Sequence, residues 1–506
     1  MLNDCIDTPV PATETFLPES SKAAGLEPGE RKRLSVEVLA RATPVSQLAS
    51  DNGVSRKFLY QQAARADEAL DETFMPSSEG KDVLYQLPIT KSWIQQFVMS
   101  LVLLGHTSYR GVVEILQTMF DYPLCIGTVH NIVRGATARA RELNTVHELS
   151  AIRVGAHDEI FQAGRPVLVG MDVDSTYCYL LAVEDHRDET TWGVHLLDLQ
   201  AQGLAPKYTI ADGGTGLRAG QRAAWKSTPC HGDVFHALQD LNRLKRFLGN
   251  RAVSATTARE KLEKQMQRAC KKGQGRSFSA KLAHARQREA QEVELAADVA
   301  TLVEWLRCDI LSLAGPDHAS RIKLYDFVIT ELRARESQCP HHIRKLCTML
   351  ENHRDNLLAF AAVLDAKLGE LARKFALPVA WLHELCQLEG QNSNQPARWQ
   401  HEAQLRQKMG SRFHPVQTAM REAMNTTPRA SSIVENLNSR LRTYFFLRRQ
   451  IGNEYLDLLR FYFNHHRFAR SDRPERQGKS PAELLTGQPQ PNWLELLLGQ
   501  DLFKRN

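Results

Sequence analysis

Residues 208–216 read YTIADGGTG, and this stretch decides the fold of the chain. An apolar run that ends in an acidic residue and enters a glycine-rich turn predicts a buried strand leading into a helix. The glycines allow the sharp turn that this connection needs. We therefore expect an α/β sheet that presents the carboxylate of Asp212 at the end of one strand.

A second acidic residue lies on a predicted β-hairpin upstream. Asp158 precedes a short apolar run, residues 162–165 form a turn, and residues 166–170 resume as a β-branched strand. Further strands are expected within 167–183 and over 192–199. Together with the strand that ends at Asp212, these segments predict a mixed five-stranded sheet covered by helices.

A third acidic residue lies on a predicted helix far downstream, in the segment SSIVENLNSRLR at 431–442. The apolar residues of this segment recur at helical spacing on one side. Glu435, Asn438 and Arg442 are separated by three and four residues, so they share another face. Cleavage of a phosphodiester can use two Mg²⁺ ions roughly 3.5 to 4 Å apart, and carboxylates are the ligands that Mg²⁺ prefers.

In combination, these segments resemble the DDE transposases of bacterial insertion sequences, which belong to the RNase H-like, retroviral-integrase superfamily. The similar stretches are HDEIFQAGRPVLVGMDVD, YTIADGGTGL, SSIVENLNSRLR, YFNHHRF and KSPAELLTG. The resemblance implies that Asp158, Asp212 and Glu435 are the catalytic, metal-binding triad for two Mg²⁺ or Mn²⁺ ions. Asp172 and Asp174, in GMDVDS, remain alternatives for the first acid.

The same resemblance implies a function and its partners. The enzyme would cut double-stranded DNA at the terminal inverted repeats of a transposon and transfer the strand to target DNA, as a homodimer or a larger synaptic oligomer. Arg442 would hold a DNA phosphate or end. Two rival functions are a non-catalytic DNA-binding regulator derived from a transposase and an RNase H-like, structure-specific nuclease.

A D-x-x-H element follows the second aspartate. Asp233 and His236 resemble a pair found beside the active site of several DDE transposases, where Asp233 would orient the local backbone and His236 would contact a phosphate or relay a proton. The competing interpretation is a hydrogen-bonded histidine at the start of a helix. Cys230 and His231 have no partner pair at a zinc-ligand spacing.

Two N-terminal segments have helical patterns that indicate helix-turn-helix modules. The first would present Arg56, Lys57, Tyr60 and Gln61 to DNA, and the second would present His130, Asn131 and Arg134. Each could instead be a helical array that only braces the rest of the chain. A further DNA contact is expected in the basic segment 241–290, which has fourteen Lys and Arg against three acidic residues. Within that segment, Lys271 and Lys272 are the expected contact points.

The spacing of the three acids predicts the domain organisation. From Asp212 to Glu435 there are 223 residues, so a sizeable and mostly helical domain must be inserted in the catalytic core, as in the hAT-like branch of the family. The expected segments are a disordered leader at 1–30, a helix-turn-helix module at 31–75, a second helical module at 88–146, the first part of the core at 150–240, the all-helical insertion at 241–424, the second part of the core at 425–490 and a C-terminal tail at 491–506.

Composition adds weaker constraints. A formal charge of only +6 makes the local basic segments more informative than the overall balance. Nine cysteines without a C-x-x-C pair argue against a disulfide scaffold or a zinc ribbon. No long apolar stretch or export signal is apparent, so the expected location is the bacterial cytoplasm, in association with the nucleoid.

Overall fold

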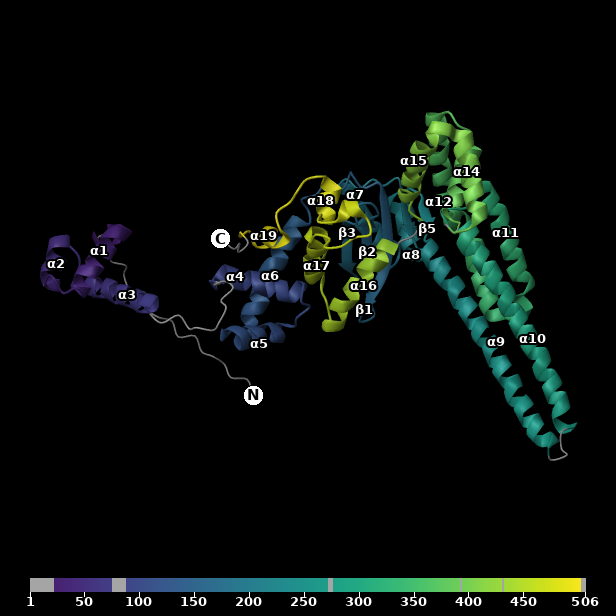
Figure 1. Ribbon diagram of the computed structural model, residues 1–506, viewed down its shortest axis with the longest axis horizontal. Coiled ribbons are helices and arrows are strands. Elements are labelled where there is room, and N and C mark those ends of the chain that lie inside the picture. Colours follow the sequence, from purple (N-terminus) through teal and green to yellow (C-terminus); the bar gives the residue numbers. More distant parts are fainter. Residues whose placement is uncertain (1–21, 75–87, 272–275, 392–393, 430–431, 502–506) are drawn as a thin grey trace. The chain divides into compact units, whose positions relative to one another are not determined.

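The computed structural model describes residues 22–74, 88–271, 276–391, 394–429 and 432–501 (Figure 1). The chain divides into two compact units, the first ending at Pro88 and the second beginning at Ile89. Among the described residues, no helix is both long and apolar enough to cross a membrane.

The first unit is all helical in its described part. Gly53 ends one helix in the left-handed conformation with φ of 63°, and the Ser55 hydroxyl accepts a bond from the Phe58 N–H at the start of the next helix. Leu48 and Leu59 belong to the small apolar core between the helices. The elements are η1 (Lys22–Gly25), α1 (Pro28–Leu39), α2 (Val45–Asn52) and α3 (Arg56–Phe74).

The disordered leader predicted at 1–30 overlaps the start of a helix. Helix α1 begins at Pro28, whose ring presets a helical φ at the first position, and the side chain and backbone of Glu27 exchange hydrogen bonds with those of Glu30. This capping box stabilises a helix that starts before Arg31. Residues 1–21 lie outside the described part of the chain, and for them the leader stays a prediction.

The second unit contains one mixed sheet of five strands, as the sequence predicted. Its order is β3-β2-β1-β4-β5, with β1, β2 and β3 antiparallel and with β4 and β5 parallel to β1. The strands are β1 (Val154–Gln162), β2 (Arg165–Asp172), β3 (Cys178–Val183), β4 (Tyr208–Ala211) and β5 (Cys230–Gly232).

The prediction of a strand over 192–199 is wrong, because this segment lies inside helix α7 (Glu189–Ala201). The Asp188 side chain caps the helix by accepting a hydrogen bond from the Thr191 N–H. Trp192, Leu196 and Leu199 are the buried apolar residues, and their spacing of four and three has a helical period. The third strand of the sheet is β3.

Helices cover both faces of the sheet. On one face, Ala156, Ile160 and Val169 share a core with helices that precede and follow the sheet in sequence. On the other face, Leu168 and Tyr179 pack with α7 and α8. The helices of the first face are α4 (Lys91–Leu103), α5 (Tyr109–Phe120), α6 (Ile126–Leu143), α16 (Ser432–Leu447), α17 (Asn453–His465) and α19 (Trp493–Leu498), and α8 spans Thr215–Ala224.

The segment between the last strand and α16 is helical in its described part. Figure 1 shows α9 and α10 as a long pair that lie side by side. The helices are α9 (Val234–Cys270), α10 (Arg276–Trp305), the π-helical turn η2 (Leu306–Ile310), α11 (His318–Ala334), η3 (Glu336–Gln338), α12 (Pro340–Phe375), α13 (Val379–Glu389), α14 (Pro396–Met409), η4 (Gly410–Arg412) and α15 (Phe413–Asn425).

The expected boundary of this insertion at residue 241 falls inside α9. That helix already starts at Val234, immediately after its cap Asp233, and continues without interruption to Cys270. The same helix therefore begins at the edge of the sheet and extends into the insertion. The start of α9 and the core are consequently one continuous structure.

The segment 491–506, expected as a tail, is a packed part of the core as far as it is described. Asn492 caps α19 in a capping box with Glu495, and Trp493, Leu494 and Leu497 are buried against the helices of the first sheet face. This amphipathic turn supplies enough apolar surface to hold the chain in place. Residues 502–506 lie outside the described part.

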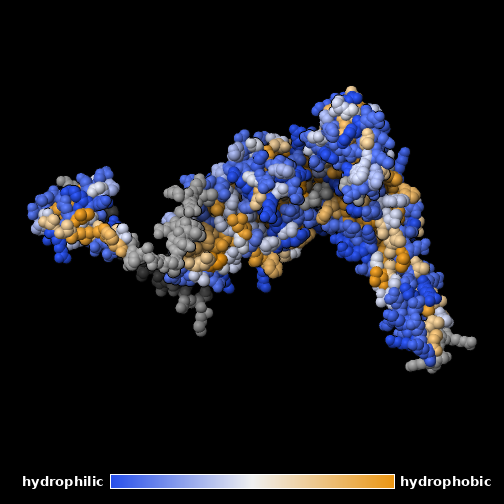
Figure 2. All heavy atoms as spheres, viewed as in Figure 1, coloured by the Kyte–Doolittle hydropathy of each residue, from blue (hydrophilic) through white to orange (hydrophobic). Residues whose placement is uncertain are grey.

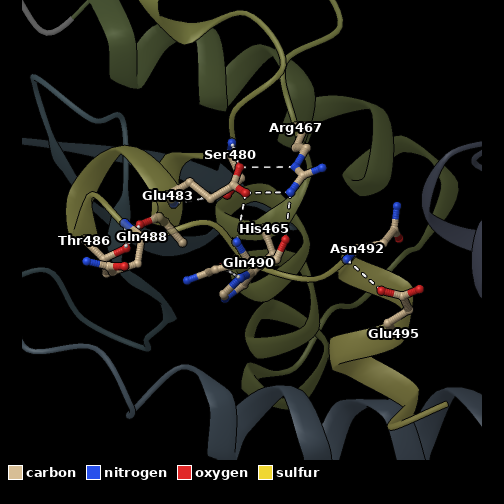
Figure 3. A network of polar contacts seen from close by, with 10 residues as sticks. His465, Arg467, Ser480, Glu483, Thr486, Gln488, Gln490, Asn492 and Glu495 are labelled. Carbon is tan, nitrogen blue, oxygen red and sulfur yellow. Dashed lines mark hydrogen bonds and ion pairs between the residues drawn. The ribbon is translucent and has the colours of Figure 1, made fainter. Parts of the chain in front are cut away.

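The motifs YFNHHRF and KSPAELLTG meet in one polar network (Figure 3). The Glu483 carboxylate, whose side chain is 7% exposed, accepts bonds from Arg467 Nη2 at 2.6 Å, from the Ser480 N–H at 2.7 Å and from the Gln490 N–H at 3.0 Å. Ser480 and Glu483 also form the capping box of α18 (Pro481–Thr486). Burial alone would raise the pKa of Glu483, but the Arg467 guanidinium and the two N–H groups outweigh it and lower the pKa to about 2.

We expect Glu483→Gln to destabilise the second unit by about 2 kcal/mol, because a charged acceptor for the Arg467 guanidinium and two backbone N–H groups is lost. The measurement is the urea midpoint of the full chain at neutral pH. A carboxyl group with a lowered pKa stabilises the fold above its ordinary value of 4.5, and this contribution is lost as the pH falls towards about 2. The exposed Glu475→Gln is the matched control, and an equal shift in both variants would contradict the role of the network.

Candidate active site

Acidic side chains gather where the central strand β1 passes the carboxyl end of β4. Strands β1 and β4 are parallel neighbours in which His157 pairs with Ala211, so Asp158 and Asp212 follow at matching positions. Glu435 lies on α16, which packs against β1 and β2 on the sheet face of Asp158. Ligand atoms of Asp158, His236 and Glu435 all lie within 4.8 Å of one another. The fold thus brings together residues that are far apart in the sequence.

Asp158 is a buried and firmly held carboxylate, 5% exposed. Its Oδ1 accepts a bond from the Glu159 N–H and its Oδ2 accepts one from Asn438 Nδ2, both at 2.8 Å. Burial raises the pKa of Asp158 to about 6, and the charges of Asp212 and Glu435 act in the same direction. The charged form of a buried carboxylate beside two other carboxylates is stabilised by nearby positive charge.

Asp212 is held by the glycine-rich turn that follows β4. Its Oδ1 accepts a bond from the Gly214 N–H at 2.8 Å, and a Cβ at Gly214 would lie 2.9 Å from that oxygen. A larger residue there would push the carboxylate away, which explains the need for glycine. Arg218, on the first turns of α8, donates from Nε to the Asp212 carbonyl at 2.8 Å.

His236 supplies positive charge to the cluster. Its Nδ1 donates to Asp233 Oδ2 at 2.5 Å, and its Nε2 lies 3.5 Å from Glu435 Oε1. Asp233 is the N-cap of α9, and its side chain is fully buried. The hydrogen bond to Asp233 raises the pKa of His236 to about 9 against the effect of burial, with Asp158 and Asp212 adding to the rise. His236 is therefore protonated at neutral pH, and its stabilising charge is lost only as the pH rises through about 9.

Arg442 is the second cation near Glu435. Its Nη2 lies 3.7 Å from Glu435 Oε2, and its side chain is 60% exposed. An exposed pair at this distance contributes little to stability. The guanidinium is consequently available to a ligand that approaches α16 from solvent.

The alternative first acids lie elsewhere. Asp172 pairs with Gly155 on β1, three residues before Asp158, and therefore occupies the opposite face of the sheet about 10 Å away along the strand. Its carboxylate accepts bonds from the N–H and the hydroxyl of Ser175 and closes a turn. Asp174 is exposed, and its carbonyl accepts a bond from Arg476. The residues brought to Asp212 and Glu435 are thus Asp158 and His236.

Two neighbours of Asp212 were missed in the sequence. Arg218 follows the glycine turn by one helical turn, and an amphipathic reading of α8 would have singled it out. His353 comes from α12 of the insertion, and a Cβ at Gly213 would lie 3.3 Å from its Nε2. No sequence signal links His353 to a turn that precedes it by 140 residues.

The residues expected to contact DNA are on surfaces. Arg56, Lys57, Tyr60 and Gln61 are exposed on α3, His130, Asn131 and Arg134 are exposed on α6, and Lys271 is exposed at the end of α9, whereas Lys272 lies outside the described residues. The inner side of α6, with Val129 and Val133, belongs to the same apolar core as the sheet. The second helical array therefore braces the core, whatever its outer face contacts.

Comparison with known proteins adds little to this geometry. No protein-family model matches the chain, and no curated protein matches it. Among the matching solved structures is one titled "Drosophila P element transposase strand transfer complex", with 10% identity, coverage of 87% of this chain and 99% of that chain, and a TM-score of 0.25. A likeness at this TM-score carries no argument, so function is inferred below from the chain itself.

We expect Asn438→Ala to weaken Mn²⁺ binding by the full chain roughly 10- to 100-fold, because Asn438 fixes one oxygen of Asp158. Isothermal titration calorimetry measures this affinity. The neighbouring Asn436 is exposed, so Asn436→Ala is the matched control. Equal affinity of the Asn438 and Asn436 variants would show that this hydrogen bond does not organise a metal ligand.

The same titration should depend on pH. A divalent ion needs the deprotonated form of Asp158, so we expect its affinity to fall roughly tenfold per pH unit below about 6, the raised pKa of this group. Above about 7 the affinity should level off if only carboxylates bind the ion. A continued rise towards pH 9 would instead show that the loss of the His236 proton favours the ion, because the ring then no longer repels it and can also act as a ligand.

Proposed function

We propose that this chain is a DDE-type transposase with an RNase H-like catalytic core, which cuts DNA at transposon ends and joins the freed strand to target DNA. The observation that carries the proposal is that the register of β1 and β4 sets Asp158 beside Asp212, while a ligand atom of Glu435 lies within 4.8 Å of one of Asp158. Each comes from a different element, β1, the turn after β4, and α16. The sheet, with three hairpin-connected strands followed by two parallel ones, is of the kind expected from the resemblance.

The donor set fits hard divalent cations such as Mg²⁺ or Mn²⁺. Asp158, Asp212 and Glu435 would hold them through carboxylate oxygens, and the raised pKa of Asp158 reflects in part a repulsion that a cation would relieve. When bound, two such ions activate the attacking water or 3′-hydroxyl and stabilise the departing oxygen. Asn438 keeps the Asp158 carboxylate in position for this role.

His236 and Arg442 have separate tasks in this proposal. His236, held by Asp233, is protonated at neutral pH and can donate from Nε2 to a phosphate oxygen or a leaving oxygen. Arg442 is exposed beside Glu435 and can bind the next phosphate of the strand. Both cations would attract the DNA backbone into an otherwise acidic site.

Binding of DNA away from the site would use exposed basic surfaces. Arg56 and Lys57 are exposed on α3. We assign the reading of terminal repeats to this unit, acting as a helix-turn-helix. In the view of Figure 2, the α9–α10 pair is largely hydrophilic, with scattered apolar residues. Its basic side chains, among them Lys271, would bind phosphates without reading sequence. Holding two ends at once would require a dimer or a larger assembly.

The test is Mg²⁺-dependent nicking and joining of labelled DNA that carries the flanking ends of the element. We expect Asp158→Asn, Asp212→Asn and Glu435→Gln each to lower both rates by roughly 10³-fold or more, a loss of about 4 kcal/mol of transition-state stabilisation. DNA binding, measured by anisotropy, should persist. Asp174→Asn removes an exposed carboxylate outside the cluster and is the matched control.

Each other outcome has a definite meaning. Full activity of a triad variant would remove that residue from the site, and loss of activity in Asp174→Asn alone would move the first acid to that position. Binding without cleavage by the unmodified chain would instead identify a DNA-binding regulator. Cleavage of branched DNA without joining would identify a structure-specific nuclease.

A further inference from the structure

Helix α16 carries a stripe of residues that starts at the acidic cluster and leads away from it. Glu435, Arg442 and Phe446 are separated by seven and four residues, so they lie within about 40° of one another around the helix. At a rise of 1.5 Å per residue, Arg442 lies about 10 Å and Phe446 about 16 Å along the axis from Glu435. The stripe therefore combines the acidic site, a cation and an aromatic ring.

Phe446 stands out by its exposure. Its side chain is 91% exposed near the end of α16, whereas Tyr444 on the inner side of the same helix is 2% exposed. The next residue, Leu447, is 46% exposed, so the apolar surface continues. Burial of a phenylalanine ring stabilises a fold, and the fold forgoes this contribution at Phe446.

The charge around Phe446 indicates what covers it. Between Glu435 and Glu454 the chain has four arginines and no acidic residue. Arg442 and Arg449 are exposed, and Arg449 makes no ion pair with any described residue. An exposed ring between two exposed guanidinium groups suits a partner that has a flat π face and regularly spaced negative charge. A nucleic acid strand has both, and its bases stack on aromatic rings when they are unpaired.

We propose that Phe446 is a stacking platform for an unpaired base of the DNA strand whose backbone runs along α16 from the acidic site. The inference rests on the proposed function, because it takes the strand from the site described above. Arg442 binds the intervening phosphate, and Arg449 binds a phosphate beyond the stacked base. The occupant is a single-stranded extension, since a base inside a duplex does not expose its face.

The test compares two DNAs with the full chain in EDTA, where no cleavage can occur. One is a fluorescein-labelled duplex with a single-stranded 3′ extension of thymidines, and the other is the blunt duplex. We expect Phe446→Ala to weaken binding of the extended duplex roughly tenfold and to leave the blunt duplex unchanged. Phe446→Trp should keep the preference for the extension, and Phe446→Leu should lose it.

Controls and a direct readout accompany the comparison. Phe327 is 48% exposed on α11, so Phe327→Ala removes an exposed ring at another place and should change neither affinity. A 5-iodouracil in the extension should form its photochemical cross-link at Phe446. An equal loss for both DNAs, no loss, or a cross-link elsewhere would overturn the proposal.

A second copy of this chain is the competing partner for the exposed ring. If Phe446→Ala lowers the sedimentation coefficient of the DNA-free protein, the ring is a subunit contact and the stacking proposal is wrong. The binding test requires no metal and no catalysis. If the binding test fails, the results of the nicking and joining assay still stand. If that assay instead disproves the transposase proposal, a preference for the extended DNA would still show that the protein binds single-stranded DNA at Phe446.

Discussion

The site is organised around one buried carboxylate, that of Asp158, which lies near the partly exposed carboxylates of Asp212 and Glu435. Asp158 is nearly inaccessible, and the charges of Asp212 and Glu435 add to the burial that raises its pKa to about 6. Three acids would not remain together without positive charge. In the protein without bound ions, His236 supplies that charge. Its ring is held by the buried Asp233, and its pKa is about 9. A divalent cation, as proposed above, would offer stronger compensation, and ligand atoms of Asp158, His236 and Glu435 lie close enough together to hold one.

The fold brings this charge arrangement together from distant parts of the chain. Strands β1 and β4 set Asp158 beside Asp212, while α16 returns after the insertion to add Glu435. The insertion is not a remote appendage, because α9 begins with the Asp233 cap and α12 places His353 against Gly213. A displacement of the insertion would therefore reach the site through two helices, α9 and α12.

Much of this was predictable where local chemistry and pattern agree. The hairpin of β1 and β2, the glycine turn after β4 and the amphipathic α16 each have a clear local signal, and all three are present. The strand expected at 192–199 failed because three buried residues spaced four and three apart also fit a helix, and the Asp188 cap decided between them. The contact of His353 with Gly213 could not be predicted, since it depends on how a long helix packs.

We propose that the carboxylates of Asp158, Asp212 and Glu435 form one divalent-metal site. Crystals of the full chain soaked in Mn²⁺, with data collected at the manganese absorption edge, would locate the ion. We expect anomalous density bounded by oxygens of these three residues, with Asn438 still bonded to Asp158. Density only beside Asp172 or Asp174, or none at an Mn²⁺ concentration that saturates the calorimetric titration, would rule out this site.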